Sequence, residues 1–240
     1  MDGDFAVKIG KDSWLCRSSI SNQSAKLFFL FLSTDICFFA LHIVALMGGW
    51  SDSYPNLYKN PYFIEMDRGY AEFFQYMKEY WCILLLGFIA IRRRSLLYLS
   101  WICFFLYLLI DDYAEIHETL GLYLSRLLNF APMFRLRARD FGEILVSALV
   151  GLFFFTCVGV AYRLGDSTFR RVSRILIILL SALAVFGIVV DMLHIMSPKT
   201  LKHVFGILED GGEMIVMSAI TTFLFVVSNE VTSNKVLSTK

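Results

Sequence analysis

Four carboxylates and one imidazole are concentrated in a short stretch that directly follows an apolar segment. Residues 96–110 are long and apolar enough to cross most of a bilayer, and they are followed by Asp111, Asp112, Glu115, His117 and Glu118. An unpaired charge at the centre of a membrane helix costs roughly 2.5–3.5 kcal/mol even on the lenient insertion scale. Asp111, Glu115 and Glu118 share one face of a continuous helix, whereas His117 lies about 120° from Asp111. His117 therefore joins these acids only if the helix bends.

Carboxylates and imidazoles recur near the ends of the other apolar segments, at spacings that place them on the same face of a helix. Asp191 and His194 are three residues apart near the end of one segment, and Glu209, Asp210 and Glu213 open the next one. Further pairs at one-face spacing are Asp35 with His42, Glu72 with Glu79, and Asp140 with Glu143. If the apolar segments alternate across a membrane, all of these residues and all four histidines of the chain fall on the same side of it.

Composition predicts an integral membrane protein. The chain of 240 residues is 57% hydrophobic and has a mean hydropathy of +0.62, whereas soluble domains are roughly 45–50% apolar. We expect an all-α fold, a single domain that is a bundle of six transmembrane helices. The predicted spans are about 27–49, 71–91, 95–118, 140–162, 175–196 and 207–227.

Basic residues predict the orientation. Two clusters of arginines fall on the same side of the membrane as the amino terminus: Arg92–Arg94, and the short loop with Arg163, Arg170, Arg171 and Arg174. Because basic residues are enriched in cytoplasmic loops, this favours cytoplasmic N- and C-termini. We expect the membrane to be a bacterial cytoplasmic membrane. Lys78 is assigned to the opposite side. A net charge of +1 argues against nucleic-acid binding, and the five scattered cysteines form no C-x-x-C pair that would indicate a thiolate or redox site.

The acidic layer needs a countercharge, because so many carboxylates cannot all ionise close together without one. No lysine or arginine is expected in the apolar part of any span. Shared protons or the arginines of the 126–139 connection would serve, but a bound divalent metal is the simplest supply. Asp, Glu and His without Cys favour zinc first, with iron or manganese as alternatives. The predicted ligands are His117, Glu118, Asp191, His194, Glu209 and Glu213; secondary candidates are Asp35, His42, Asp112, Glu143 and Asp210.

A metal at this position is compatible with hydrolysis of a lipid amide or ester that arrives from the bilayer. Zinc lowers the pKa of bound water to about 7, and Asp111 or Glu115 would act as the general base. The arrangement resembles the general plan of the alkaline ceramidases, multi-pass proteins with Asp and His metal ligands near helix ends. The resemblance is limited to residue types, because those proteins typically have seven spans.

Two other functions fit the same residues. Intramembrane acids and histidines also mark pathways for protons or divalent cations, although the polar residues cluster in one half of the spans and no internal repeat is visible. An accessory subunit that binds a partner protein through its acidic face is the third interpretation. Individual pairs also have structural explanations: hydrogen bonds across helices for Asp35 and His42, interface solvation for Glu72 and Glu79, and a helix cap for Asp140.

Overall fold

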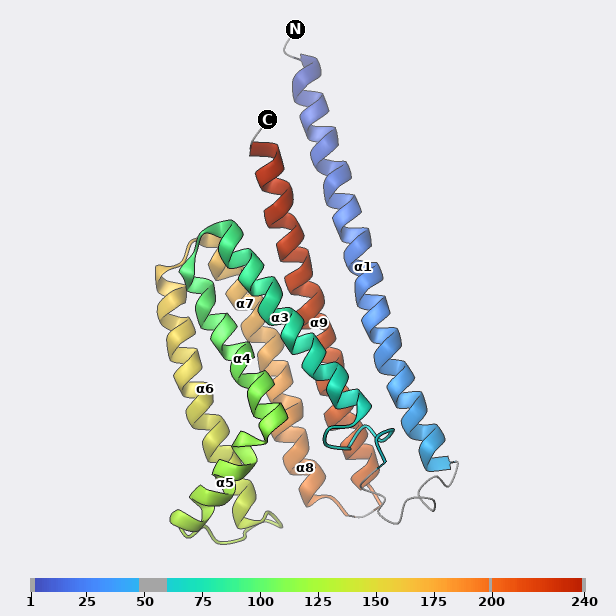
Figure 1. Cartoon of the computed structure of the whole chain (residues 1–240), viewed down its shortest axis with the longest axis vertical. Coiled ribbons are helices and arrows are strands. Elements are labelled where there is room, and N and C mark those ends of the chain that lie inside the picture. The colour runs from blue at the N-terminus through green and yellow to red at the C-terminus, as the bar shows by residue number, and fades with distance from the viewer. Residues whose placement is uncertain (1–2, 48–59, 199, 239–240) are drawn as a thin grey trace.

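The described part of the chain is helical, and six of its helices can span a membrane. The computed structural model describes residues 3–47, 60–198 and 200–238, with side chains described between residues 22 and 233 of those ranges. The helices are α1 (Gly3–Met47), α3 (Tyr70–Arg93), α4 (Leu99–Ala114), α5 (Ile116–Leu127), α6 (Ala138–Leu164), α7 (Ser167–Ala184), α8 (Asp191–Met196) and α9 (Lys202–Ser238) (Figure 1). A 3₁₀ turn, Leu96–Tyr98, precedes α4, and a π-helical turn, Val185–Val190, joins α7 to α8.

The long apolar helices confirm the all-α fold and the six predicted segments of membrane-spanning length. The segments long and apolar enough to cross a membrane are Asn22–Met47, Tyr70–Arg93, Leu96–Ala114, Ala138–Leu164, Ser167–Met196 and Lys202–Ser233, as expected of a multi-pass membrane protein. The start of α1 and the end of α9 lie at the same end of the bundle, opposite α5 and α8 (Figure 1). The connection between the first two predicted spans, residues 50–70, lies partly outside the described residues, because residues 48–59 are not among them.

Helix α9 is the central element of the bundle. It packs against α1, α3, α7, the π-helical turn and α8. The apolar core includes Met217, Ile220 and Leu224 of α9. These residues follow the acids at the start of α9 and precede its end, which lies at the same end of the bundle as the start of α1 (Figure 1).

The third predicted span is shorter than expected, because the helix breaks at Glu115. Glu115 adopts φ 50° and ψ 43°, which is left-handed backbone, so α4 ends at Ala114 and a separate helix, α5, begins at Ile116. Non-glycine residues rarely adopt this conformation. The break redirects the chain, and this is the bend that His117 needs in order to reach Asp111.

Close backbone contact fixes α5 against α6. Gly121 of α5 faces Gly142 of α6, and a Cβ atom on Gly142 would clash with the carbonyl oxygen of Gly121. Glycine at both positions therefore lets the two helices cross with their backbones in contact. The contact holds α5 across the end of the bundle, beneath the acidic residues.

The expectation that no basic residue lies inside a span is wrong, because Lys78 is completely buried in α3. Its Nζ lies 3.0 Å from Asp35 Oδ1 and donates to the carbonyl oxygen of Met214 at 2.8 Å and to Ser218 Oγ at 3.2 Å. Ser218 Oγ donates in turn to Asp35 Oδ2 at 2.6 Å. Lys78 lies more than two turns inside α3, on a face covered by α1 and α9, and it neutralises Asp35 there.

The basic loop expected at residues 163–174 is also mostly helical. Asp166 accepts a hydrogen bond from the backbone N–H of Phe169 and caps α7, which begins at Ser167. Arg170, Arg171 and Arg174 therefore lie on the first turns of α7, since a capping acid can start a helix among charged residues.

Candidate metal centre

Three of the six predicted ligands converge at the end of α9. Asp191 and His194 come from α8 and Glu209 from α9, and one ligand atom of each lies within 4.8 Å of the other two. His194 Nδ1 is 2.7 Å from Glu209 Oε2, and all three residues are half-buried. We call Asp191, His194 and Glu209 the trio. One imidazole and two carboxylates are a donor set that zinc, iron and manganese accept.

The π-helical turn before Asp191 positions two of these ligands. A π turn rotates the residues that follow it relative to an α-helix and often occurs at functional sites. It packs closely on α9, because a Cβ atom on Gly187 would overlap Glu213 Oε1 and a Cβ atom on Gly212 would overlap the ring of Phe186. Glycine at these two positions therefore brings α8 and α9 close enough for the trio to form.

The trio lies in a single large cavity. The cavity has a volume of about 1010 Å³, and its lining includes every predicted site residue except Asp35 and His42. Its polar end is formed by α5, α8 and the start of α9, and it continues between apolar side chains such as Phe104, Phe155 and Leu180. The one-sided layer of acids expected from the sequence is therefore largely the wall of one cavity.

Asp35 and His42 belong to different contacts. Asp35 is fully buried against Lys78, and His42 Nδ1 accepts a hydrogen bond from the backbone N–H of Ile64 at 3.2 Å. Both residues therefore make buried contacts between segments, the structural explanation given above for this pair.

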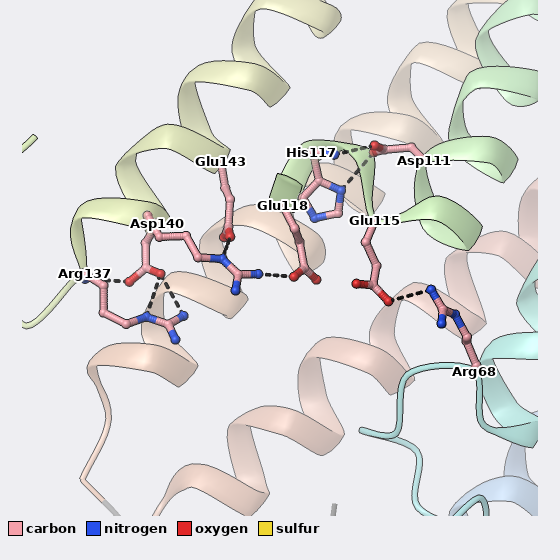
Figure 2. Close-up of polar contacts among 9 residues, drawn as sticks. Arg68, Asp111, Glu115, His117, Glu118, Arg137, Asp140 and Glu143 are labelled. Atoms are coloured by element: carbon pink, nitrogen blue, oxygen red, sulfur yellow. Dashed lines mark hydrogen bonds and ion pairs between the residues drawn. The ribbon is translucent and has the colours of Figure 1, made fainter. Parts of the chain in front are cut away.

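His117 and Asp111 form a hydrogen-bonded dyad on the cavity wall (Figure 2). Asp111 Oδ1 accepts from the backbone N–H of His117 at 2.8 Å, and Asp111 Oδ2 lies 3.0 Å from His117 Nδ1. The hydrogen bond from Asp111 raises the pKa of His117 from 6.5 to about 9, so the imidazole is charged at neutral pH. Both carboxylate oxygens of Asp111 are engaged with His117, and His117 contacts Asp111 rather than the trio.

Arginines neutralise the acids at the rim of the cavity, as Figure 2 shows. Arg139 bridges Glu118 and Glu143, and Arg68 Nη2 lies 3.0 Å from Glu115 Oε1. Of the four arginines in the 126–139 connection, Arg139 thus serves as the expected countercharge of these acids. Arg137 pairs with Asp140 instead, and Arg135 donates to the carbonyl oxygen of Met196.

Asp140 is a helix cap, as its structural explanation proposed. Arg137 and Asp140 form a capping box at the start of α6, and the Arg137 guanidinium lies 2.8 Å from Asp140 Oδ1 (Figure 2).

Two buried polar side chains that line the cavity were not among the site residues predicted from the sequence. Gln75 and Glu79 of α3 are only 7% and 1% exposed. Gln75 Nε2 donates to Glu213 Oε2 at 3.3 Å, which directs Glu213 toward α3. The sequence shows the regular spacing of Glu72, Gln75 and Glu79, but because these residues are near the start of a helix, it favoured their solvation at the membrane interface. In the structure, Gln75 and Glu79 are buried, because α3 packs against α4 and α9.

Comparison with known proteins gives a family and no function. No curated protein and no solved structure matches the chain. Residues 36–227 match a family described as "Domain of unknown function (DUF8692)", and this range contains the trio, the Asp111–His117 dyad, Gln75 and Glu79. Because the match covers most of the chain, the protein belongs to the DUF8692 family.

Proposed function

We propose that the protein is an intramembrane metal-dependent hydrolase in which Asp191, His194 and Glu209 hold a zinc-type ion. The observation that carries this proposal is the convergence of the trio, from two helices, in the wall of a 1010 Å³ cavity. Catalytic zinc sites typically have three His, Asp or Glu ligands and one open position. Bound there, zinc would supply Lewis acidity and a water molecule with a pKa near 7.

The geometry supports a different role for His117 and Asp111 than the sequence suggested. His117 is held by Asp111 and carries a proton at neutral pH, so we assign it the role of general acid that protonates the leaving group. Asp111 then acts as the positioning residue that orients the imidazole, in the same way as the carboxylate of a catalytic triad. Glu115 is paired with Arg68 at the rim, which leaves it less suited to act as a base than the sequence suggested.

The shape of the cavity supports a substrate that enters from the bilayer. Leu152 and Phe155 of α6 line the cavity together with Val185 and Val189 of the π-helical turn, and these four residues are 46–67% exposed. We infer that the cavity opens between α6 and the π-helical turn, at a surface that would face lipid. An acyl chain in this opening would place the amide or ester bond of a lipid near the polar end of the cavity.

A hydrolysis assay tests this proposal. We would load the purified protein with zinc in lipid nanodiscs and measure fatty-acid release from a panel of acyl amides and acyl esters. We expect release that a chelator stops and zinc restores, and that His194→Ala and Glu209→Gln abolish. Glu230→Gln, which changes an exposed carboxylate on α9, is the matched control. Zinc-loaded protein that releases no fatty acid from any member of the panel would contradict the hydrolase assignment.

Proton transport is a second candidate, favoured by one observation. Polar groups continue beyond the cavity, because Glu79 of its wall is followed along the bundle by the buried Lys78–Asp35 pair and Ser218. Such a chain of ionisable groups is typical of a proton relay. Proton flux into liposomes that Asp35→Asn abolishes would favour transport, whereas absence of flux would exclude it.

A further inference from the structure

Four polar side chains line the cavity wall about one helical turn deeper than the trio. Gln75 and Glu79 belong to α3, Asp112 to α4 and Glu213 to α9, and all four line the cavity. Glu213 is four residues after Glu209, which places it about 6 Å farther along α9. Gln75 Nε2 donates to Glu213 Oε2, so α3 and α9 meet at this point.

Two oxygen atoms of this cluster are buried without a hydrogen-bond partner. They are Gln75 Oε1 and Glu79 Oε2, on side chains that are more than nine-tenths buried. The orientation of Gln75 follows from its contact, because a flipped amide would place Gln75 Oε1 against a carboxylate oxygen of Glu213. A buried polar atom without a partner costs about 1–3 kcal/mol, so such atoms call for a ligand.

No described lysine or arginine forms an ion pair with the acids of this cluster. Lys78, next to Glu79 in the chain, directs its Nζ toward Asp35, Met214 and Ser218 instead. The arginines of the rim pair with Glu115, Glu118, Asp140 and Glu143. Three carboxyl groups and one amide oxygen therefore line this part of the cavity without an ion pair to any described lysine or arginine.

We propose that Gln75, Glu79, Asp112 and Glu213 form a second cation site, separate from the trio, that binds a hard divalent cation such as Mg²⁺ or Mn²⁺. All of its donors are oxygen atoms, which Mg²⁺, Ca²⁺ and Mn²⁺ prefer, whereas the imidazole of the trio favours zinc. The cation satisfies both orphan oxygens and neutralises the carboxylates. Gly187 belongs to the site as well, because any larger residue would displace Glu213.

The binding of Mn²⁺ to the full-length protein tests this site. We would remove metals with a chelator, return one equivalent of Zn²⁺, titrate with Mn²⁺ and measure free Mn²⁺ by electron paramagnetic resonance. We expect the wild type to bind Mn²⁺, Glu79→Gln and Glu213→Gln to lose it, and His194→Ala to keep it while losing zinc. Glu72→Gln is the matched control, because Glu72 lies on the same helix and lines the same cavity but accepts a hydrogen bond from the backbone N–H of Arg68.

A variant that leaves the charge unchanged keeps the test decisive if the carboxylate variants fail to fold. Gln75→Leu removes only the amide ligand, and we expect it to weaken Mn²⁺ binding by at least the roughly ten- to hundredfold that loss of a partner outside the ligand shell typically costs. Wild-type protein that binds no Mn²⁺, or Mn²⁺ binding that Gln75→Leu leaves unchanged, would overturn the proposal. Loss of Mn²⁺ together with zinc in His194→Ala would reduce the two sites to one. Each of these results leaves the role of the trio to be judged separately, from zinc content and hydrolysis.

Discussion

The acids of this protein differ in what neutralises each of them. Lysine or arginine pairs with Asp35, Glu115, Glu118, Asp140 and Glu143. Among the described residues, no such ion pair is formed by Glu79, Asp112, Asp191, Glu209 or Glu213. The carboxyl groups of both proposed metal sites are therefore among the acids without such a pair, which also include Asp67, Glu72, Asp111 and Asp210 of the cavity wall. Sequence reasoning found most members of both groups but could not separate them, because the pairing depends on which helix faces which.

The Asp111–His117 dyad predicts a shift in a histidine titration. The pKa of His117 is raised in the folded protein, so the charged imidazole stabilises the fold fully below pH 6.5 and ceases to do so as the pH rises through about 9. Asp111→Asn removes the main cause, and we expect the pKa of His117 to fall toward 6.5. Nuclear magnetic resonance of labelled histidine measures it, with Glu230→Gln as the control. An unchanged pKa in Asp111→Asn would refute the dyad.

The Lys78–Asp35 pair predicts a large and asymmetric effect on stability. Lys78→Met leaves Asp35 as an unpaired buried charge, which typically costs about 3–5 kcal/mol of the free energy of unfolding. Replacing both residues with apolar ones, as in Lys78→Met with Asp35→Leu, should recover most of that loss. Denaturant unfolding in one detergent compares the three proteins. Equal stability of the wild type and Lys78→Met would show that the pair does not form.

At the scale of helices, the apolar runs of the sequence predicted the positions of the six spans. They did not predict where the helices end or where they bend. The length and hydropathy of each run were sufficient for the six spans. Helix α9 continues past the last apolar residue, because polar residues do not by themselves stop a helix. The break at Glu115 and the π turn before Asp191 had no clear signal, since neither has a proline and the left-handed residue is a glutamate. Tertiary contacts, such as the crossing of α5 and α6, decide such features.

The crossing of α5 and α6 can be tested with two glycines of one helix. Gly142→Ala adds a methyl group where the backbone of Gly121 already lies, so we expect a loss of about 1–3 kcal/mol in the free energy of unfolding, as for overpacked sites. Gly151→Ala is the matched control, because a Cβ atom there has no atom within 4 Å. The unfolding midpoints of the two variants should therefore differ clearly. If both variants lose the same stability, the close crossing is wrong.

For the whole molecule, the sequence predicted the one-sided distribution of polar residues but not the cavity. Alternation of spans was enough to place the acids and histidines in one layer. The inferred opening depends on the spacing between α6 and the π-helical turn, which no pattern of residues reports. The shared end of α1 and α9 (Figure 1) agrees with six crossings and leaves the direction of insertion to the positive-inside rule.

Reporter fusions test that direction. We expect a reporter after Arg94 to be cytoplasmic and a reporter after Ser197 to be on the opposite side of the membrane, because Arg92–Arg94 and the arginines at the start of α7 should stay inside. A reporter after Arg163 should match the first. The reversed pattern would invert the orientation, and the same location for Arg94 and Ser197 would contradict the proposed spans.

The most direct test of the trio as a metal site is elemental analysis of the purified protein by plasma mass spectrometry. The wild type, His194→Ala, Glu209→Gln and the control Glu230→Gln would be purified from the membrane in the same detergent and compared for bound metal per chain. Our account predicts zinc, iron or manganese in near-stoichiometric amount in the wild type and the control, and its loss in both trio variants. Full metal content in His194→Ala and Glu209→Gln, or no metal in the wild type after incubation with zinc, would contradict it.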